Sequence, residues 1–264
     1  MMRHARALLS HSSAAGLRRL ASAALDRSTI TLRAHLAETH DALFVDLSNT
    51  VGRSIWLRGV YEEAVTRTIM TYLRPGGTFV DVGANVGYFA VRACRSVGPT
   101  GAVHAIEANP RLVALLERSK HANGFDQLTI HPLAVADFRG VAELQVQRSS
   151  GVSFLGSRSS TRPGDKVVRV ENVPVAPLDD VLSPALTAGL SVLKIDVEGR
   201  ELDVLKGASQ LLTHGPPIVI ELVEANLARF STSVAEVKAF LASYAYSPLK
   251  IEGAPYDWAF VRRA

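Results

Sequence analysis

The sequence predicts an α/β fold of the doubly wound kind, a mostly parallel sheet with helices on both faces and an antiparallel hairpin at its carboxyl-terminal end. Two observations predict this fold. From residue 78 onward, short apolar runs alternate with segments of helical periodicity, which is typical of βαβ units and a parallel sheet. Near the end of the chain, residues 246–251 and 257–262 form two strand-like runs around a Gly-Ala-Pro turn, which indicates the closing hairpin.

The first elements precede the alternating series. Two strand-like runs, 42–49 and 54–60, flank a turn at Asn49–Gly52. Residues 62–73 carry apolar side chains at helical spacing, and the following Pro75-Gly76-Gly77 ends that helix. We therefore expect a short hairpin and one helix before the sheet begins.

The alternating series occupies most of the remaining chain. Its strands are predicted at 78–82, 102–106, 128–134, 191–196 and 217–223, with helices at about 86–96, 110–121 and 200–212. A later helix begins after Ser233, which has the spacing of a capping box with Glu236. Residues 141–176 are the least regular stretch. We expect them to form either an acceptor-binding loop or a surface hairpin, and to set specificity together with residues 41–62.

The positive charge of the chain is concentrated near its amino terminus. The formal net charge is +4, and residues 1–40 alone hold six arginines against two acidic residues, so the other 23 basic and 23 acidic side chains cancel. A body without net charge disfavours a nucleic-acid partner, because nucleic-acid-binding domains carry a basic surface. We predict two regions, a basic extension over 1–40 that is disordered or helical, and a folded domain over 41–264.

The extension itself is rich in Arg, Ala and Ser. Its composition suits a transit peptide, a weakly amphipathic helix at an anionic surface, or an unspecialised amino terminus. It lacks the apolar core of a secretory signal, and no run approaches the about 18 apolar residues of a transmembrane segment. The single cysteine, Cys94, suits a reducing compartment. We therefore expect a cytoplasmic protein without a transmembrane segment.

The stretch FVDVGANVGY, residues 79–88, has the pattern of a strand that runs into a glycine-rich turn and the start of a helix. Such a turn presents backbone N–H groups to a ligand. Gly83 and Gly87 lack side chains that would block a close approach, and Asn85 tolerates a left-handed backbone. The Gly-x-Gly-x-x-Gly pattern of dinucleotide sites is incomplete, which disfavours a pyrophosphate ligand.

Glu107 ends the next predicted strand, 20 residues after Gly87. An acidic residue at this place binds ribose hydroxyls in doubly wound folds, because one carboxylate accepts hydrogen bonds from both. The alternative is a solvated Glu at a helix start, where Pro110 suits the first turn. We favour the ribose, and we expect the nearby His104 to pack rather than to react.

Two further carboxylates, Asp196 and Glu198, follow another buried strand in the stretch VLKIDVEGRE. The carboxyl ends of parallel strands line one crevice, so both side chains are expected to face the same cleft as the glycine-rich turn. Glu201 lies at the start of the next helix, where an acidic side chain suits the helix dipole. A structural and a functional role both stay open for Glu201.

Five stretches together resemble the FkbM-type methyltransferase family, a branch of the class I S-adenosylmethionine-dependent enzymes: FVDVGANVGYFAV, AIEANP, LAVAD, LKIDVEGRELDVLKGA and IVIELVE. They stand in the right order between Asp46 and Val261, and the pair GANVG and KIDVEG is the most specific. The resemblance implies a Rossmann-like sheet of seven strands with a reversed final hairpin. It also implies S-adenosylmethionine as the methyl donor, and a hydroxyl of a sugar, glycan or natural product as the acceptor.

The resemblance assigns roles to individual residues. It implies that Asp81 lies near the methionine amino group of the donor, Glu107 on its ribose, and Ala134 and Val135 beside its adenine. The cofactor-binding residues expected on this basis are Asp81, Val82, Gly83, Ala84, Asn85, Gly87, Tyr88, Glu107, Ala108, Ala134 and Val135.

A hydroxyl acceptor is a weak nucleophile and calls for a general base. Asp196 and Glu198 are the candidates, and His131 is a third. Asp196 and Glu221 end adjacent strands, but two oxygen ligands are too few for us to predict a metal ion.

Two other classes of function stay open. An RNA methyltransferase has a similar glycine-rich turn, although amino-group methylases often carry an Asn/Asp-Pro-Pro-aromatic turn where this chain has Asp196-Val197-Glu198-Gly199. The other class is a nicotinamide oxidoreductase or a non-catalytic binding module, against which the incomplete glycine pattern and Glu107 argue.

Overall fold

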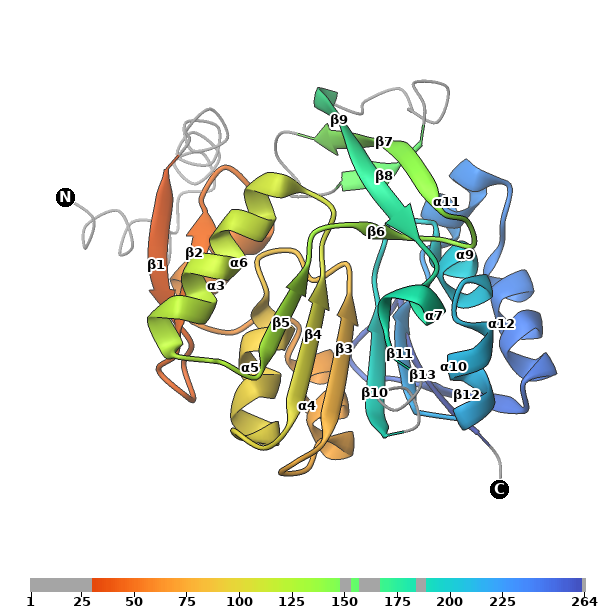
Figure 1. Ribbon diagram of the computed structural model, residues 1–264, viewed down its shortest axis with the longest axis horizontal. Coiled ribbons are helices and arrows are strands. Elements are labelled where there is room, and N and C mark those ends of the chain that lie inside the picture. Colours follow the sequence, from red (N-terminus) through yellow and green to blue (C-terminus); the bar gives the residue numbers. More distant parts are fainter. Residues whose placement is uncertain (1–29, 148–152, 157–166, 184–188, 263–264) are drawn as a thin grey trace.

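The computed structural model describes residues 30–147, 153–156, 167–183 and 189–262. Figure 1 shows a central sheet flanked by helices on both faces, with a smaller sheet beyond one end of its strands. The central strands are β3 (Thr78–Val82), β4 (Ala102–Ile106), β5 (Leu128–His131), β10 (Leu190–Ile195), β11 (Ile218–Glu221), β12 (Tyr246–Lys250) and β13 (Asp257–Arg262). They form one sheet in the order β12-β13-β11-β10-β3-β4-β5.

The direction of these strands confirms the predicted fold class. Strands β3, β4, β5, β10 and β11 are parallel to one another, whereas β13 runs antiparallel to both β11 and β12. The sheet therefore has seven strands, is mostly parallel, and ends in the antiparallel hairpin that the sequence indicated.

Helices cover both faces of the central sheet. They are α3 (Thr50–Arg58), α4 (Glu63–Tyr72), α5 (Tyr88–Val97), α6 (Pro110–Asn123), α7 (Leu178–Val181), α9 (Glu201–Lys206), α10 (Ser209–His214), α11 (Glu224–Leu227) and α12 (Val234–Ser243), with a 3-10 turn η2 (Ala228–Phe230). Strand residues alternate between the faces, so that Phe79 packs with α3 to α6 while Val80 packs with α7 and α9 to α12. The predicted capping box is present, because the side chains of Ser233 and Glu236 each accept from the other's backbone N–H.

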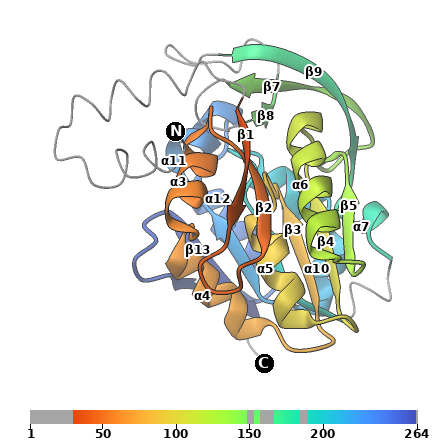
Figure 2. The same ribbon diagram turned by 90° about the vertical axis from the view of Figure 1, so that its left-hand side faces the viewer.

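The smaller sheet forms a roof over the carboxyl ends of the central strands. Its strands are β6 (Ala134–Val135), β7 (Gly140–Gln147), β8 (Ser153–Leu155) and β9 (Val167–Ala176), in the order β6-β9-β7-β8. Figures 1 and 2 both place β7, β8 and β9 above the ends of the central strands. The described residues of 141–176 are more regular than expected, because β7 and β9 pair in a long antiparallel ladder, which agrees with the hairpin alternative.

Two predicted strands have different structures. Residues 54–60 mostly lie in helix α3, because the Asn49 side chain accepts a hydrogen bond from Gly52 N at 2.6 Å and caps a helix instead of making a turn. The predicted strand 128–134 is divided into β5 and β6 at Pro132, which has no N–H for a ladder hydrogen bond. Strand β6 then leaves the central sheet and pairs with β9 in the roof.

The predicted helix 200–212 is also divided, into α9 and α10. The break lies at Gly207, where an added Cβ would approach the carbonyl oxygen of Ala136 to 2.3 Å. This close contact joins the helix layer to the base of the roof. No helix in the described part of the chain is long and apolar enough to cross a membrane.

The amino-terminal boundary of the folded domain lies earlier than residue 41. Strand β1 (Thr31–His35) pairs with β2 (Ala42–Asp46), and Ala34 and Leu36 are buried in the same core cluster as Leu43. The partner of β2 is therefore β1 rather than the run 54–60. We propose that the domain begins near residue 30, and the rest of the predicted extension lies outside the described residues.

Candidate active site

A pocket opens at the carboxyl ends of the central strands, beneath the roof. Its empty space is about 860 Å³, part of which is open to solvent, and it is lined from β3, β4, β10 and β11, from the roof strands β6, β7 and β8, and from the start of α4. A concave site at the carboxyl ends of the strands, between the sheet and the roof, is a candidate binding site for a small molecule.

The glycine-rich turn forms one part of this wall. Gly83 has a left-handed φ of 80°, and an added Cβ would lie 1.8 Å from the carbonyl oxygen of Asp196. Asn85 is also left-handed, with a φ of 53°, and its side-chain Oδ1 accepts from Val86 N at 2.8 Å. A glycine is thus required at position 83 because β3 and β10 converge there, which keeps the turn open to the pocket.

Three residues predicted in this turn do not line the pocket. An added Cβ at Gly87 would meet the side chain of Leu116 on α6 at 2.1 Å, so this glycine allows a helix to pack rather than a ligand to approach. Tyr88 packs edge-on against Tyr61, with ring centroids 5.9 Å apart. Ala84 is buried beneath the turn. The sequence pattern identified the turn, but it did not distinguish the residues that line the pocket from those that pack against the rest of the fold.

Glu107 lies in the pocket wall at the end of β4. Its carboxylate accepts from Asn85 N at 2.8 Å through Oε2 and from Asn109 N at 2.7 Å through Oε1. Burial raises the pKa of Glu107 to about 7, and the backbone N–H donors oppose that rise. The carboxylate is therefore fixed in orientation and ties the glycine-rich turn to the start of α6.

The residues predicted to lie beside the adenine also line the pocket. Ala134 and Val135 of β6 line the pocket together with Ala108, and Leu133 and Leu112 extend the apolar surface next to Glu107. The roof contributes Ser153, whose hydroxyl accepts from Asn109 Nδ2 at 3.2 Å. This side of the pocket is an apolar slot with one buried carboxylate at its edge.

Asp81 is not in the pocket wall. It is fully buried between β10 and β4, and its nearest ionic partner is Lys194, with Nζ 3.7 Å from Oδ1. Burial raises the pKa of Asp81 to about 6, against the attraction of Lys194. Lys194 also donates to Asp196 Oδ2 at 3.2 Å, and these carboxylates hold its pKa above the usual value despite burial. The structure therefore places Asp81 behind the site, where it acts on Asp196 through a shared lysine.

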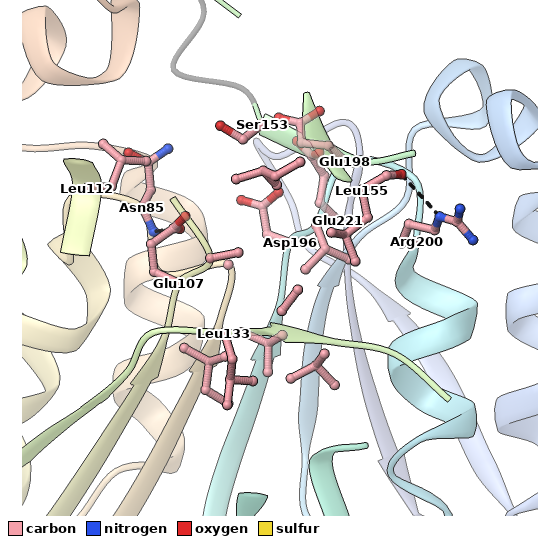
Figure 3. Close-up of a pocket in the computed structure, with 18 of the residues that line it drawn as sticks. Asn85, Glu107, Leu112, Leu133, Ser153, Leu155, Asp196, Glu198, Arg200 and Glu221 are labelled. Atoms are coloured by element: carbon pink, nitrogen blue, oxygen red, sulfur yellow. Dashed lines mark hydrogen bonds between the residues drawn. The ribbon is translucent and has the colours of Figure 1, made fainter. Parts of the chain in front are cut away.

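The opposite side of the pocket is acidic. Asp196 and Glu198 lie just after β10, Glu221 ends β11, and Glu62 immediately precedes α4; we call these four residues the acidic end. Figure 3 shows Glu107 and Asn85 on one side of the pocket. It shows Asp196, Glu198 and Glu221 gathered on the other side. Asp196 and Glu198, the two predicted bases, thus line the pocket on the side opposite Glu107, the residue predicted to bind the ribose.

Burial and repulsion between neighbouring carboxylates raise the pKa values of carboxyl groups at the acidic end. Burial and the charge of Asp196 raise the pKa of Glu198 to about 8 and that of Glu221 to about 9. Burial also raises the pKa of Glu62, while Lys194 lowers it. Carboxyl groups with raised pKa values in a cleft are typical of catalytic and binding sites.

The turn that carries Glu198 is held by the following helix. Glu198 has a left-handed φ of 60°, and its Oε2 accepts from Asn226 Nδ2 at 2.8 Å. Glu201 is almost fully buried, and its Oε1 accepts from Gly199 N at 3.0 Å and from Val197 N at 3.3 Å. The structure therefore gives Glu201 a structural role, which is to fix the backbone between Asp196 and α9.

The third candidate base, His131, is outside the pocket. Its Nε2 lies 3.0 Å from Nδ1 of His104, and the two rings are stacked in the sheet. Burial lowers the pKa of both rings, that of His104 to about 4 with help from His131. The pair packs within the fold and supplies no base to the site.

Several lining residues were not named individually from the sequence, although they lie in the segments 41–62 and 141–176 that were expected to set specificity. Tyr61 and Glu62 come from the start of α4, Val51 from α3, and Leu155 from the roof strand β8. The helical pattern of 62–73 predicted α4, but nothing in it indicated that its first residues cover the ends of β10 and β11. Among the described residues, no group of three or more His, Cys, Asp or Glu is arranged to hold a metal ion.

The protein is thus a doubly wound α/β protein whose pocket, at the carboxyl ends of the strands, joins an apolar wall to a cluster of acidic side chains. A family model described as the methyltransferase FkbM domain matches residues 81–248, which is more than half of the sequence. The chain belongs to the FkbM methyltransferase family and is a methyltransferase. A search of curated proteins gives no match.

Solved structures with a similar fold include three methyltransferase-fold proteins of low sequence identity. One is a SAM-dependent methyltransferase from Aquifex aeolicus, with 15% identity over 74% of this chain and 87% of that chain, and a TM-score of 0.42. Another is M. jannaschii TYW2 in complex with AdoMet, with 13% identity over 89% and 84% and a TM-score of 0.46. The third is P. horikoshii TYW2 in complex with MeSAdo, with 15% identity over 89% and 70% and a TM-score of 0.47.

Proposed function

We propose that this methyltransferase transfers a methyl group from S-adenosylmethionine to a hydroxyl group of a sugar, a glycan or a natural product. The observation that supports a hydroxyl acceptor is the acidic end, which lies across the pocket from Glu107. A hydroxyl reacts well only when a nearby group takes its proton, and carboxylates supply that group here.

The residues of the other side fit S-adenosylmethionine. Each Glu107 oxygen accepts one backbone N–H and keeps a lone pair for a ribose hydroxyl. Leu133, Ala134 and Val135 offer an apolar surface for a base, and Gly83 lines the pocket between them and Asp196. S-Adenosylmethionine, when bound, supplies an electrophilic methyl group. Asp81 is no longer expected to contact it.

Within the acidic end, we assign the proton acceptor to Asp196. Its side chain is 28% exposed, and Lys194 fixes one of its oxygens from below. Glu198 has a pKa raised to about 8 by burial and by Asp196, so near pH 7 it carries a proton and donates a hydrogen bond to the acceptor. The two carboxyls would then have different tasks, with one accepting the proton and the other orienting the acceptor.

The experiment replaces each carboxyl in turn. Formation of S-adenosylhomocysteine is measured with a panel of sugars, glycosides and an RNA oligonucleotide, and the best acceptor is then tested with Asp196→Asn and Glu198→Gln. Asp196→Asn should lower turnover about 10²–10⁴-fold. Donor affinity should not change, and the exposed Glu252→Gln serves as the control.

Near-full activity of both variants would show that the enzyme works by proximity alone. Methylation of the RNA in place of any hydroxyl compound would overturn the proposal in favour of the RNA-directed alternative. The acidic end argues against that alternative, because carboxylates repel the phosphates of a nucleic acid. Family membership leaves no support for a nicotinamide oxidoreductase, whereas a cytoplasmic location remains a prediction.

A further inference from the structure

We propose that the acidic end of the pocket recognises a positive charge, so that the acceptor is a hydroxyl compound that also bears a protonated amine. The inference rests on the proposed function, since it takes the acidic end as the place of the acceptor. An amino sugar or an amino alcohol has the required chemistry, whereas a phosphorylated or carboxylated acceptor does not.

The first support is the register of the central sheet. Strands β10, β11 and β13 are neighbours, and Ile195 and Ile220 pair at one level while Glu221 and Asp257 pair at the next. Asp196 directly follows Ile195. Three adjacent strands therefore present a carboxyl group at the same edge, and Glu62 adds a fourth from the start of α4.

The second support is the shortage of positive charge around these carboxyls. Lys194 lies below them and is shared by Asp81 and Asp196. Arg200 is the one cation in the described pocket wall, and it is paired with Asp203 at 2.7 Å and donates to the carbonyl oxygen of Leu155. In Figure 3 its guanidinium points away from the acidic end. Two further cations lie nearby: Arg229 stacks on Phe154 and attracts Glu198, and Lys250 lies over the Trp258 ring and acts on Asp257.

Because these carboxyls are buried and few cations lie near them, their pKa values are raised and they stay protonated to higher pH. Burial and neighbouring carboxylates raise the pKa of Glu221 to about 9 and that of Asp257 to about 7, with Lys194 and Lys250 acting in the opposite direction on Asp257. A bound ammonium group would replace those protons as the counter-charge. Binding of a cation should therefore release protons to the buffer near neutral pH.

An aromatic side chain completes the arrangement. Tyr61 lines the pocket next to Glu62, and its ring packs edge-on against Tyr88 and at an interplanar angle of 60° against Phe89. An aromatic ring beside carboxylates is a favourable environment for an ammonium group, because the ring face and the carboxylates both attract it. A neutral polyol would use the carboxylates but gain little from the ring.

The sulfonium of the methyl donor is the other positive charge that could balance this end. The test therefore uses protein saturated with S-adenosylhomocysteine, which lacks that charge. Glucosamine, methyl glucoside and glucuronate are titrated into it by calorimetry in two buffers of different ionisation enthalpy. Glucosamine should bind about five- to tenfold more tightly than methyl glucoside and release protons, and glucuronate should not bind.

Variants locate the preference. Glu62→Gln and Glu221→Gln should each reduce the advantage of glucosamine over methyl glucoside, whereas Glu252→Gln, at an exposed position, should keep it. Equal affinity for the three sugars, a preference for glucuronate, or no saturable binding of glucosamine would overturn the inference. Failure of the protein to bind S-adenosylmethionine or S-adenosylhomocysteine would instead overturn the proposed function, and direct measurement of that binding comes first.

Discussion

Glu107 and Glu221 are two carboxyls of one pocket that owe their positions to different parts of the fold. Glu107 accepts two backbone N–H groups from residues close to it in space, Asn85 and Asn109, and its pKa rises to about 7 through burial. Glu221 stands among other carboxyls at the ends of adjacent strands, and burial with the charges of Asp196 and Glu198 raises its pKa to about 9. Glu107 is stabilised by backbone hydrogen-bond donors, whereas Glu221 is stabilised by binding a proton.

The two sides of the pocket therefore differ. On the Glu107 side the carboxylate already has its hydrogen-bond donors, whereas at the acidic end the carboxyls have few cations as counter-charges. A carboxylate held by backbone donors is organised before its ligand arrives, so a neutral substitute there loses hydrogen bonds. A carboxylate among other carboxylates is destabilised by like-charge repulsion, so replacing it with a neutral side chain removes that repulsion. Four substitutions test this difference between the two sides of the pocket.

The largest effect is expected at Lys194. Lys194→Met removes the one cation shared by Asp81 and Asp196 and leaves Asp81 buried without a counter-charge. The free energy of unfolding, measured by urea titration, should fall by about 3–5 kcal/mol. The exposed Lys206→Met is the control, and adding Asp81→Asn to Lys194→Met should restore part of the loss. A fall no larger than in the control would show that the acidic end does not depend on this lysine.

The next effect concerns the contact that joins the two sides of the pocket. Gly83→Ala places a Cβ against the carbonyl oxygen of Asp196 at a left-handed φ of 80°, and should lower the free energy of unfolding by about 2–4 kcal/mol. Gly124 is the matched control, because its φ of 64° and ψ of 41° are left-handed but its added Cβ meets nothing within 4 Å. Gly124→Ala should cost only about 1 kcal/mol. Equal costs at both positions would mean that β3 and β10 do not converge as described.

A smaller effect is expected for Glu107→Gln, measured as the affinity for S-adenosylmethionine by calorimetry. The substitution puts an amide NH₂ opposite a backbone N–H and removes an acceptor for the ribose, so binding should weaken by about 1–3 kcal/mol. Glu252→Gln should leave the affinity unchanged. An unaltered affinity in folded Glu107→Gln protein would remove Glu107 from the donor site.

The smallest effect has the opposite sign. Because the pKa of Glu221 is raised from 4.5 to about 9, its proton contributes stability that is complete below pH 4.5 and is lost as the pH rises through 9. Glu221→Gln keeps the neutral form, so at pH 9 the variant should be more stable than the wild type by about 1 kcal/mol. Thermal unfolding between pH 5 and pH 9 measures this difference. A variant that is less stable at every pH would show that Glu221 is satisfied in the same manner as Glu107.

The parts that the sequence predicted well are those in which a local pattern carries the information. The central strands, the glycine-rich turn and Glu107 follow from alternating apolar runs and the residues at their ends. Asp196 and Glu198 follow from the rule that parallel strands end at one edge.

Other features depend on contacts that no local pattern contains. Glu62 reaches the pocket only because α4 packs against β10 and β11, and Asp81 faces Lys194 because β3 and β10 align these two residues. Helix α3 was not predicted because Asn49 is common both in turns and at helix N-caps, and the sequence was interpreted as a turn.

The division of the pocket between chain segments has a consequence for changing the enzyme. The Glu107 side is lined by the βαβ core and by β6 and Ser153 of the roof, whereas Tyr61 and Glu62 lie in a segment that precedes that core. A chimera that receives residues 50–62 from another family member should therefore change its acceptor preference, while its affinity for S-adenosylmethionine stays the same.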